Sequence, residues 1–496
     1  MPIGNRTLHF HLALSAVHGD SVSDLPQLTN SLSPVCPGLF YGVTAADGLL
    51  LRIRISGGQL RREQGQGLVA LAEHLGVETL QITNRANIQL RRLKEIPRPE
   101  VLERLQALGL AAKSPAVDVL RNVMISPLAG LTATELVDFS PWLRELDLFL
   151  TQHPGLAQLP AKFSIGLDGG GPCSIGQRSE HPAEHRYNEI QFTALAVDPE
   201  LVPGLYPGIY LHLTFGIDKG CLPTGILVSP DQGLPLIKAL IWAYLDYCQA
   251  PDRSPKIRLR EIIADWGLET FLTQAKRYLD FPLIRHSKIP PPPTHPGQAH
   301  LGIHPQAEPE QVYIGIGLPQ GQISSAQLRG LVDLSARFGS GDLRLTPWQT
   351  ILLVNIVAAQ IPLVLKQLGQ LNLSPFPPPR QGIIACAGKP GCVAAHTSTQ
   401  AHAQLLGAYL DTLPLPQPVN IHLTACPKAC AHPSPAAMTL LGIDGGQGKE
   451  EIYRFYRGDF RDDQAPLMAE APLVDLLPRI AAALGVKVLP SHPGRI

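Results

Sequence analysis

The chain has 496 residues, 45% of them hydrophobic, and it carries 41 basic and 41 acidic side chains. The balanced charge excludes the basic excess by which proteins bind nucleic acid or anionic membranes, and no run approaches the roughly 20 apolar residues of a membrane span. We therefore expect a globular cytoplasmic protein of about three or four domains.

Residues 1–35 are expected to form a loosely ordered leader. Their short apolar stretch, Leu8–Val17, is broken by two histidines, which weakens its resemblance to a secretion signal. The first predicted domain therefore begins at Cys36.

An internal repeat follows: residues 51–110 align with residues 314–373 without a gap, and Gly58, Thr83 and Pro99 fall on identical residues. In each copy, alternating apolar residues predict a strand and a helical period predicts a helix, before a second strand and a second helix. The predicted elements lie at 51–55, 68–75, 79–90 and 99–108, and at 314–318, 331–338, 342–353 and 362–371. Each unit alone would leave a sheet edge unpaired, so we expect the two to pair into one pseudo-symmetric α+β domain.

The Pro-rich segment 289–297 divides the chain into halves and is predicted to be an extended linker. In each half, a repeat unit precedes a larger mixed domain of ordinary size. The predicted domains are repeat units at 36–117 and 298–375 and α/β domains at 118–288 and 380–496.

Four of the eight cysteines lie within 45 positions, spaced Cys-x5-Cys at Cys386 and Cys392 and Cys-x3-Cys at Cys426 and Cys430. Turn residues between the first pair let the chain curl back, and the second pair is predicted to share one face of a helix that begins at Pro427. Four thiolates suit a 4Fe-4S cluster. A zinc site and two disulfides are the alternatives, but zinc knuckles are usually Cys-x2-Cys and disulfides are rare in the cytoplasm.

Three further strings, together with the cysteine pairs, resemble the sulfite and nitrite reductases. Thr83–Gln89 resembles a strand whose arginine, here Arg85, faces the active-site anion. Arg121–Val123 resembles a string that contacts tetrapyrrole carboxylates, and Leu159–Phe163 resembles the segment that brings lysine, here Lys162, to the anion.

The resemblance covers nearly the whole chain and implies an α+β fold with a duplicated reductase-like architecture. Two ferredoxin-like half-units would pair into one domain, and two larger mixed α/β domains would follow them, the second with the cluster. Cys430 would be the thiolate that couples the cluster to sirohaem. The electrons would come from an external donor such as ferredoxin.

Two residues depart from the reductase pattern. Ser164 stands where the reductases have a second lysine, and Lys428 stands where they usually have asparagine. Several strings are more similar to the precorrin-3B synthases of the same superfamily, namely Cys36–Leu39, Arg344–Trp348, 385–392 and 426–433.

The synthase resemblance implies that precorrin-3A, a tetrapyrrole of aerobic cobalamin biosynthesis, is hydroxylated at C20 with γ-lactone formation. Dioxygen would be the oxidant, and the cluster would feed an iron that is either sirohaem or a non-haem centre. A ferredoxin-dependent sulfite or nitrite reductase with sirohaem is the alternative. The implied catalytic residues are Arg85 and Lys162, and the implied tetrapyrrole-binding residues are Asn84, Arg85, Arg121, Lys162, Arg344 and Lys428.

Overall fold

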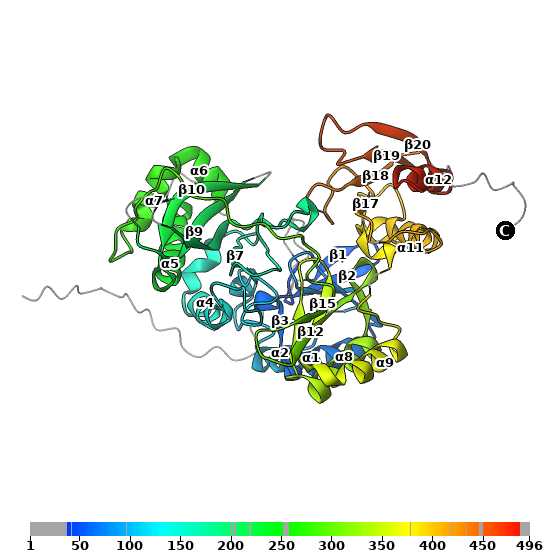
Figure 1. Cartoon of the computed structure of the whole chain (residues 1–496), viewed down its shortest axis with the longest axis horizontal. Helices are drawn as coiled ribbons and strands as arrows, with labels where there is room; N and C mark the ends of the chain where they lie inside the picture. The colour runs from blue at the N-terminus through cyan, green and yellow to red at the C-terminus, as the bar shows by residue number, and fades with distance from the viewer. Residues whose placement is uncertain are drawn as a thin grey trace, which may run out of the picture. The chain divides into compact units, whose positions relative to one another are not determined.

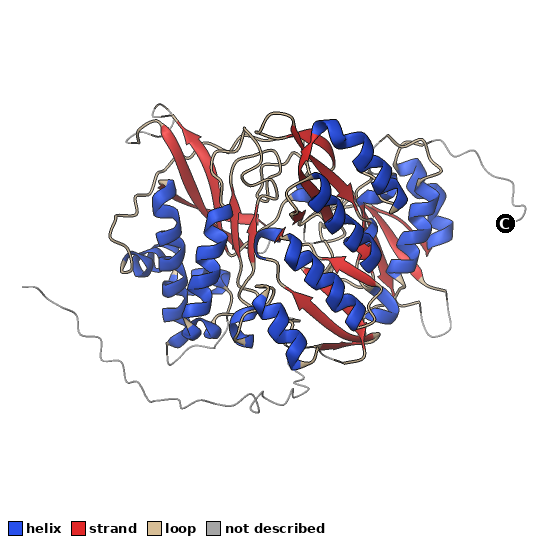
Figure 2. Ribbon diagram, turned by 90° about the horizontal axis from the view of Figure 1, so that it is seen from below, coloured by secondary structure: helices blue, strands red, loops and turns tan. Residues whose placement is uncertain are grey.

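The computed structural model describes residues 37–486 except 41, 96, 199, 201, 203–204, 218–219, 251–256, 377, 417, 433 and 446–449. The predicted leader and Cys36 lie outside the described residues. Over the described ranges the chain forms four five-stranded sheets with helices packed against them, as Figures 1 and 2 show. No helix in these ranges is both long and apolar enough to cross a bilayer.

The predicted repeat forms two half-units of the same design. The first contains β1 (Val43–Ala45), β2 (Gly48–Ile53), β3 (Gln59–Leu60), α1 (Arg62–His74), β4 (Thr79–Ile82), β5 (Ile88–Leu93) and α2 (Pro99–Ala107). The second contains β11 (Gly302–Pro305), β12 (Gln311–Gly317), β13 (Gln322–Ser324), α8 (Ser325–Phe338), β14 (Leu343–Leu345), β15 (Thr350–Val357) and α9 (Ile361–Gln370).

The predicted single strands 79–90 and 342–353 are wrong, because each is two antiparallel strands joined by a tight turn. In the first turn the Thr83 hydroxyl accepts the N–H groups of Arg85 and Asn87, and Ala86 has a φ of 55°. The same turn recurs in the second copy, where Gln349 has a φ of 62°. Both turn segments, Thr83–Asn87 and Thr346–Thr350, are mostly polar, but apolar residues resume directly after each turn, so the prediction joined the two strands into one.

The half-units pair by exchanging strands. β13 of the second unit completes the sheet β1-β2-β5-β4-β13, and β3 of the first completes β11-β12-β15-β14-β3. The apolar faces of both sheets share one core, and α1, α2, α8 and α9 lie side by side below them in Figure 1. The expected pairing into one domain is therefore confirmed, and it covers the edges that each unit would leave open.

Gly58 makes this junction tight, so Gly58→Ala is expected to destabilise the protein. Its φ is +69°, and an added Cβ would lie 2.3 Å from the Leu345 carbonyl oxygen of the other half-unit. Gly76 is a matched control, because its φ is +63° and a Cβ there would meet nothing within 4 Å.

In urea unfolding, Gly76→Ala should cost about 1–2 kcal/mol for the left-handed backbone alone. Gly58→Ala should cost about 1–3 kcal/mol more, because the carbonyl must also move. Equal unfolding midpoints for the two variants would show that the strand exchange tolerates the extra methyl group.

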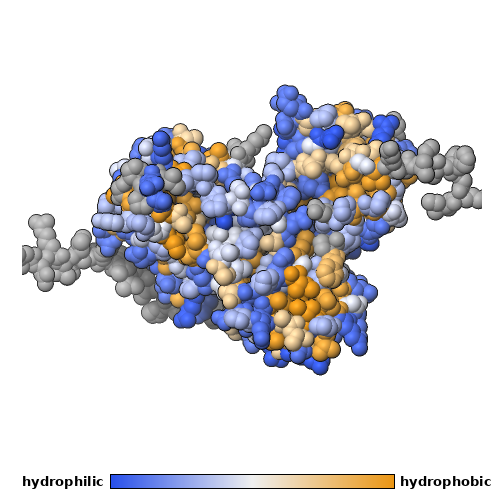
Figure 3. Space-filling model, viewed as in Figure 1, coloured by the Kyte–Doolittle hydropathy of each residue, from blue (hydrophilic) through white to orange (hydrophobic). Residues whose placement is uncertain are grey.

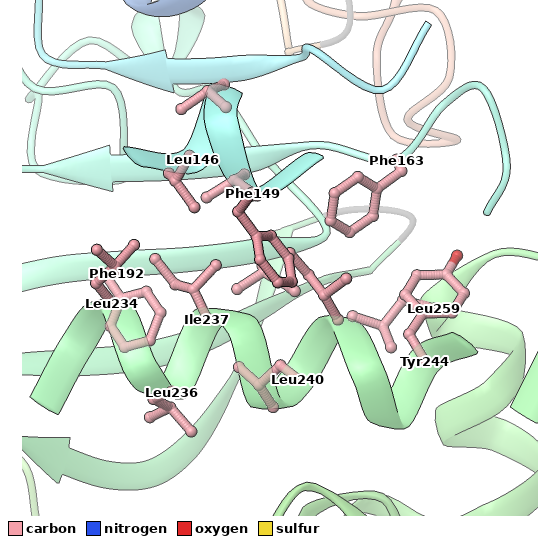
Figure 4. Packing of buried hydrophobic residues seen from close by; sticks show 14 of the residues in the cluster. Leu146, Phe149, Phe163, Phe192, Leu234, Leu236, Ile237, Leu240, Tyr244 and Leu259 are labelled. Carbon is pink, nitrogen blue, oxygen red and sulfur yellow. The ribbon is translucent and has the colours of Figure 1, made fainter. Parts of the chain in front are cut away.

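The first mixed domain has the strand order β10-β9-β8-β7-β6. Its strands are β6 (Val123–Ile125), β7 (Ile165–Asp168), β8 (Ile190–Val197), β9 (Gly208–Ile217) and β10 (Gly220–Val228). Its helices are α3 (Pro115–Asp118), α4 (Ser140–Gln152), α5 (Pro230–Gln249), α6 (Leu259–Trp266) and α7 (Leu268–Lys276). Figure 4 shows Phe149 and Phe192 packed against Ile237 and Leu240 of α5 in the core.

The second mixed domain has the strand order β16-β17-β18-β19-β20. Its strands are β16 (Ile383–Ala385), β17 (Ile421–Thr424), β18 (Met438–Ile443), β19 (Ile452–Arg457) and β20 (Leu467–Pro472). Its helices are α10 (Gly388–Gly391), α11 (Thr399–Leu410) and α12 (Leu473–Ala483). In both mixed domains the first three strands are parallel and the last two antiparallel, so the duplication extends beyond the half-units.

The surface view in Figure 3 shows separate hydrophobic areas between hydrophilic side chains. Val393 and Phe376 are among the most exposed large apolar residues, at 91% and 64%. Val393 directly follows Cys392, one of the four cysteines predicted to hold the cluster.

Candidate cluster-binding loops and active-site face

The four cysteines of the predicted cluster come from loops at one edge of a sheet. Cys386 follows β16 and Cys426 lies two residues after β17, and these strands are parallel neighbours. Their carboxyl ends therefore meet at the same edge, where loops of open α/β sheets hold ligands. The Ala425 N–H donates to the Cys386 Sγ at 3.2 Å, which ties the two loops together.

The other three thiols are close enough to Cys430 to affect its pKa. Burial raises the pKa of Cys430, and the neighbouring Cys426, Cys386 and Cys392 raise it further, whereas Lys428 lowers it. Among the described residues, no three His, Cys, Asp or Glu side chains are grouped so that they could hold one metal ion. In a cubane each thiolate binds a different iron, so its cysteines stand apart around the cluster. The four thiols are the predicted ligands of such a cluster.

The loop that carries Cys426 and Cys430 is not the helix that the four-residue spacing predicted. The chain there forms turns, and Ala429 has a φ of 48°, which a right-handed helix does not allow. The turns leave Cys430 and Lys428 exposed, and Cys386, Cys392 and Cys426 partly exposed.

A polar face of the first half-unit lies opposite its apolar core. The alternation in β2 and β5 places Leu51 and Leu90 in the core and Arg52, Gln89 and Arg91 on the other face. An amide ladder crosses that face: the Arg52 Nη2 donates to Gln89 at 3.2 Å, and Gln89 donates to Gln81 at 3.4 Å. The sequence interpretation missed this face, although the run Leu51-Arg-Ile-Arg-Ile55 already displays its period of two.

Arg85 extends from the turn between β4 and β5 toward the first mixed domain. Its Nη1 donates to the Asn188 Oδ1 at 2.8 Å and its Nη2 to the Tyr187 carbonyl at 3.3 Å. The guanidinium is only partly buried and therefore retains access from one side. The neighbouring Asn84 lines a cavity of about 120 Å³ whose walls include Trp348 and Arg186.

Lys162 and Ser164 lie directly before β7, and Ser164 contacts the residue that follows Asn188, a partner of Arg85. The Ser164 hydroxyl is buried and accepts the N–H of Glu189, the residue after Asn188, at 3.3 Å. Lys162 is exposed. Arg85 and the Lys162 segment therefore contact neighbouring residues of the same strand region. The neutral hydroxyl of Ser164 stands there in place of the second lysine of the reductases.

Arg121 lies in a buried ion-pair network. Its Nε contacts the Asp147 Oδ1 at 2.6 Å, its Nη1 contacts the Asp118 Oδ1 at 3.5 Å, and its Nη2 donates to the Gly109 carbonyl. These acids raise its pKa against the effect of burial. All three arms of the guanidinium are therefore used within the protein.

The next residue of the same string, Asn122, contacts the lysine segment instead. Its Nδ2 donates to the Phe163 carbonyl at 3.1 Å, and its Oδ1 accepts from Arg54 at 3.1 Å. Arg54 is 1% exposed and directly follows β2. Asn122 and Arg54 are thus two site-building residues that sequence reasoning missed.

Arg344 lies on β14, opposite Gln59 of the exchanged strand β3. Burial lowers its pKa, and its nearest charges are Asp342, Asp138 and Glu135. Its Nε and Nη1 are buried without a hydrogen-bond partner in the described part of the chain. Arg344 is therefore surrounded by acidic side chains, whereas Arg85 is held by the neutral Asn188 side chain and the Tyr187 carbonyl.

Glu135, close to Arg344, is expected to make stability depend on pH. Burial raises its pKa from 4.5 to about 8 in the folded protein. Between these values the folded state holds a proton that the unfolded state has released, so the stabilisation is complete below about pH 4.5 and is lost as the pH rises toward 8. In urea unfolding across this window, the free energy of unfolding should fall with pH by up to about 1.4 kcal/mol per unit. Glu135→Gln should flatten that slope, and an unchanged slope would assign the pH dependence to other groups.

The fold defines a class of duplicated proteins with two paired half-units and two mixed domains, in each of which the first three strands are parallel. Models of known families agree. Residues 44–108 and 304–371 match the nitrite/sulfite reductase ferredoxin-like half domain, and residues 116–283 match the nitrite and sulphite reductase 4Fe-4S domain. The cysteine pairs lie outside these matched ranges.

Full-length relatives give the same result. A ferredoxin–nitrite reductase of Synechococcus elongatus is 31% identical over 413 residues, covering 82% of this chain and 78% of the relative. The sulfite reductase [ferredoxin] 2 of Mycolicibacterium paratuberculosis is 28% identical over 417 residues, covering 80% and 71%. The chain belongs to the nitrite/sulfite reductase family, whose members bind a 4Fe-4S cluster and sirohaem.

A solved structure supports the fold. The NirA protein of Mycobacterium tuberculosis superimposes with a TM-score of 0.70 at 24% identity, covering 87% of this chain and 79% of that one. The predicted duplicated α+β architecture is thereby confirmed. The relatives named here are reductases, so they favour the reductase alternative over the predicted synthase.

Proposed function

We propose that the protein is a ferredoxin-dependent nitrite or sulfite reductase. The observation that carries the proposal is the pair of cysteine loops at the carboxyl edge of β16 and β17, in a chain that resembles such reductases over most of its length. Cys386, Cys392, Cys426 and Cys430 would hold the 4Fe-4S cluster, and Cys430 would couple it to sirohaem. Together these groups supply stored electrons and a metal that binds the anion.

The side chains of the polar face have distinct roles in this proposal. Arg52 and Gln89 offer fixed donors for the carboxylates of a tetrapyrrole, since arginine suits carboxylates. Arg85 offers a positive charge to the anion without reorganising, because Asn188 and Tyr187 already hold its guanidinium. Lys162 is free in solvent to supply charge or a proton.

The electron donor would dock beside the cluster loops. Cys430 and Lys428 are exposed there, and Val393 adds 91% exposed apolar surface next to Cys392. An exposed apolar residue beside a cation suits a transient contact with an acidic redox carrier. The two relatives named above are both named as ferredoxin-dependent reductases.

A precorrin-3B synthase-like oxygenase is the second candidate, and two observations favour it. Ser164 is buried and neutral beside Arg85, and Arg121 is occupied by Asp118 and Asp147, so the site has few free cations for a small anion. A multi-electron reduction of an anion depends on such charge. Lys428, next to Cys430, also departs from the reductase pattern, and precorrin-3A has carboxylates that could use Lys162 and Arg85.

Parallel turnover assays on anaerobically purified protein would separate the two functions. The reductase predicts a visible sirohaem band and consumption of nitrite or sulfite with reduced ferredoxin. The synthase predicts oxygen-dependent conversion of precorrin-3A and little reduction of either anion. Turnover of precorrin-3A alone would overturn the proposal in favour of the second candidate.

A further inference from the structure

Arg91 lies in a β-bulge of β5. Between the pairs Leu49–Leu93 and Leu51–Leu90, two residues of β5, Arg91 and Arg92, oppose one residue of β2. Arg92 has a φ of 60°, which marks the bulge. Bulges re-aim side chains and are frequent beside active sites.

The second half-unit contains the same bulge with a different side chain. Val354 and Asn355 oppose Tyr313 between β12 and β15, and Asn355 has a φ of 58°. Val354 occupies the position of Arg91 in the repeat, and it is fully buried in an apolar cluster. The bulge is therefore a property of the duplicated fold, whereas the arginine is particular to the first copy.

Arg91 joins the first half-unit to the cluster-binding loop. Its Nη2 donates to the Gly391 carbonyl at 2.7 Å, directly before Cys392. Asp47 holds the guanidinium from the other side, with Nη2–Oδ1 at 3.0 Å and Nε–Oδ2 at 3.3 Å. A Cβ on Gly391 would lie 2.7 Å from the Arg91 Nη2, so the loop and the guanidinium are in close contact.

We infer that Arg91 is a positioning residue that fixes the Cys386–Cys392 loop on the first half-unit and raises the reduction potential of its cluster. The inference rests on the proposed cluster. The guanidinium is 22% exposed and Asp47 9%, so solvent screens the pair only in part. A nearby cation stabilises the reduced cluster, which has one more negative charge than the oxidised cluster, and charge and hydrogen bonding are established determinants of cluster potential.

The test compares Arg91→Gln with Arg92→Gln in the full chain. Both variants remove one positive charge from the same bulge. Arg92, however, is 78% exposed, and its Nε contacts the Asp47 Oδ2 at the longer distance of 3.8 Å. In EPR-monitored redox titrations, Arg91→Gln should shift the ratio of reduced to oxidised cluster about tenfold toward oxidised at a fixed potential, about 59 mV for a one-electron couple. Arg92→Gln should leave the potential near that of the wild-type protein.

Arg91→Lys keeps the charge but loses the fork that spans Asp47 and Gly391. The reduction potential of the cluster in this variant should stay close to the wild-type value. Its EPR line shape should change, because the loop is held less firmly. The same titration of Arg91→Lys tests the inference if Arg91→Gln does not fold. Equal potentials for Arg91→Gln and Arg92→Gln, or for Arg91→Lys and wild type with an unchanged line shape, would overturn the inference. Wild-type protein without iron and labile sulfide would instead contradict the proposed cluster itself.

Discussion

Cys430→Ser is expected to purify without an intact 4Fe-4S cluster. Serine replaces a thiolate ligand with a poorly acidic hydroxyl, and even weaker changes around metal sites cost about 10- to 100-fold in affinity. Iron and labile sulfide, about four of each per chain in the wild type, should fall far below the wild-type content. The broad visible absorption of the cluster should disappear with them.

Cys221→Ser is the matched control for this loss. Cys221 is partly exposed and lies on β10 of the first mixed domain, and burial raises the pKa of its thiol to about 11. This variant should keep full iron content. A full cluster in Cys430→Ser would refute the ligand assignment, whereas loss in both variants would indicate general instability.

Arg85→Gln is expected to lower kcat for nitrite by about 10²- to 10³-fold, the usual cost of removing one fixed charge-stabilising donor. Asn188 and Tyr187 hold the arginine in place, so the wild-type site does not need to reorganise. The shorter amide cannot offer the same charge. Steady-state kinetics with reduced ferredoxin would give kcat and KM separately.

Arg92→Gln controls for the loss of one positive charge on the same half-unit, and its kcat should equal that of the wild type. Iron content and visible spectrum should be unchanged in both variants, because neither arginine binds the cluster. A normal kcat for nitrite in Arg85→Gln would remove Arg85 from the anion site. It would then favour the tetrapyrrole-oxidising candidate, if precorrin-3A turnover fell in the same variant.

Much of the fold could be predicted because the duplication is written in the sequence. The gapless match of 51–110 with 314–373 predicts two equal units, and both units form. The turns at Thr83 and Thr346 were missed because apolar residues stand on both sides of each turn, although Asn84, Asn87 and Pro347 are residues typical of turns. The helix expected at Pro427 failed because the positive φ of Ala429 is imposed by the loop around the cysteines, not by local propensity.

The candidate site was predictable where chemistry depends on residue type and spacing. Four cysteines in two pairs indicate a cluster before any contact is known, and the string around Arg85 indicates an anion. Asn122, Arg54 and Asn188 were not predictable, because each acquires its role from a partner between 41 and 103 positions away.

The sequence by itself determined the repeat, the pairing of the cysteines that are the predicted ligands and the family-like strings, because periodicity, thiol chemistry and motif spacing are local properties of the chain. Only the tertiary structure decided which basic residues are available. Arg121 is occupied by Asp118 and Asp147, whereas Arg91 reaches Gly391 across 300 positions. A guanidinium is equally charged in every sequence context, and its function depends on which acceptors the fold places beside it.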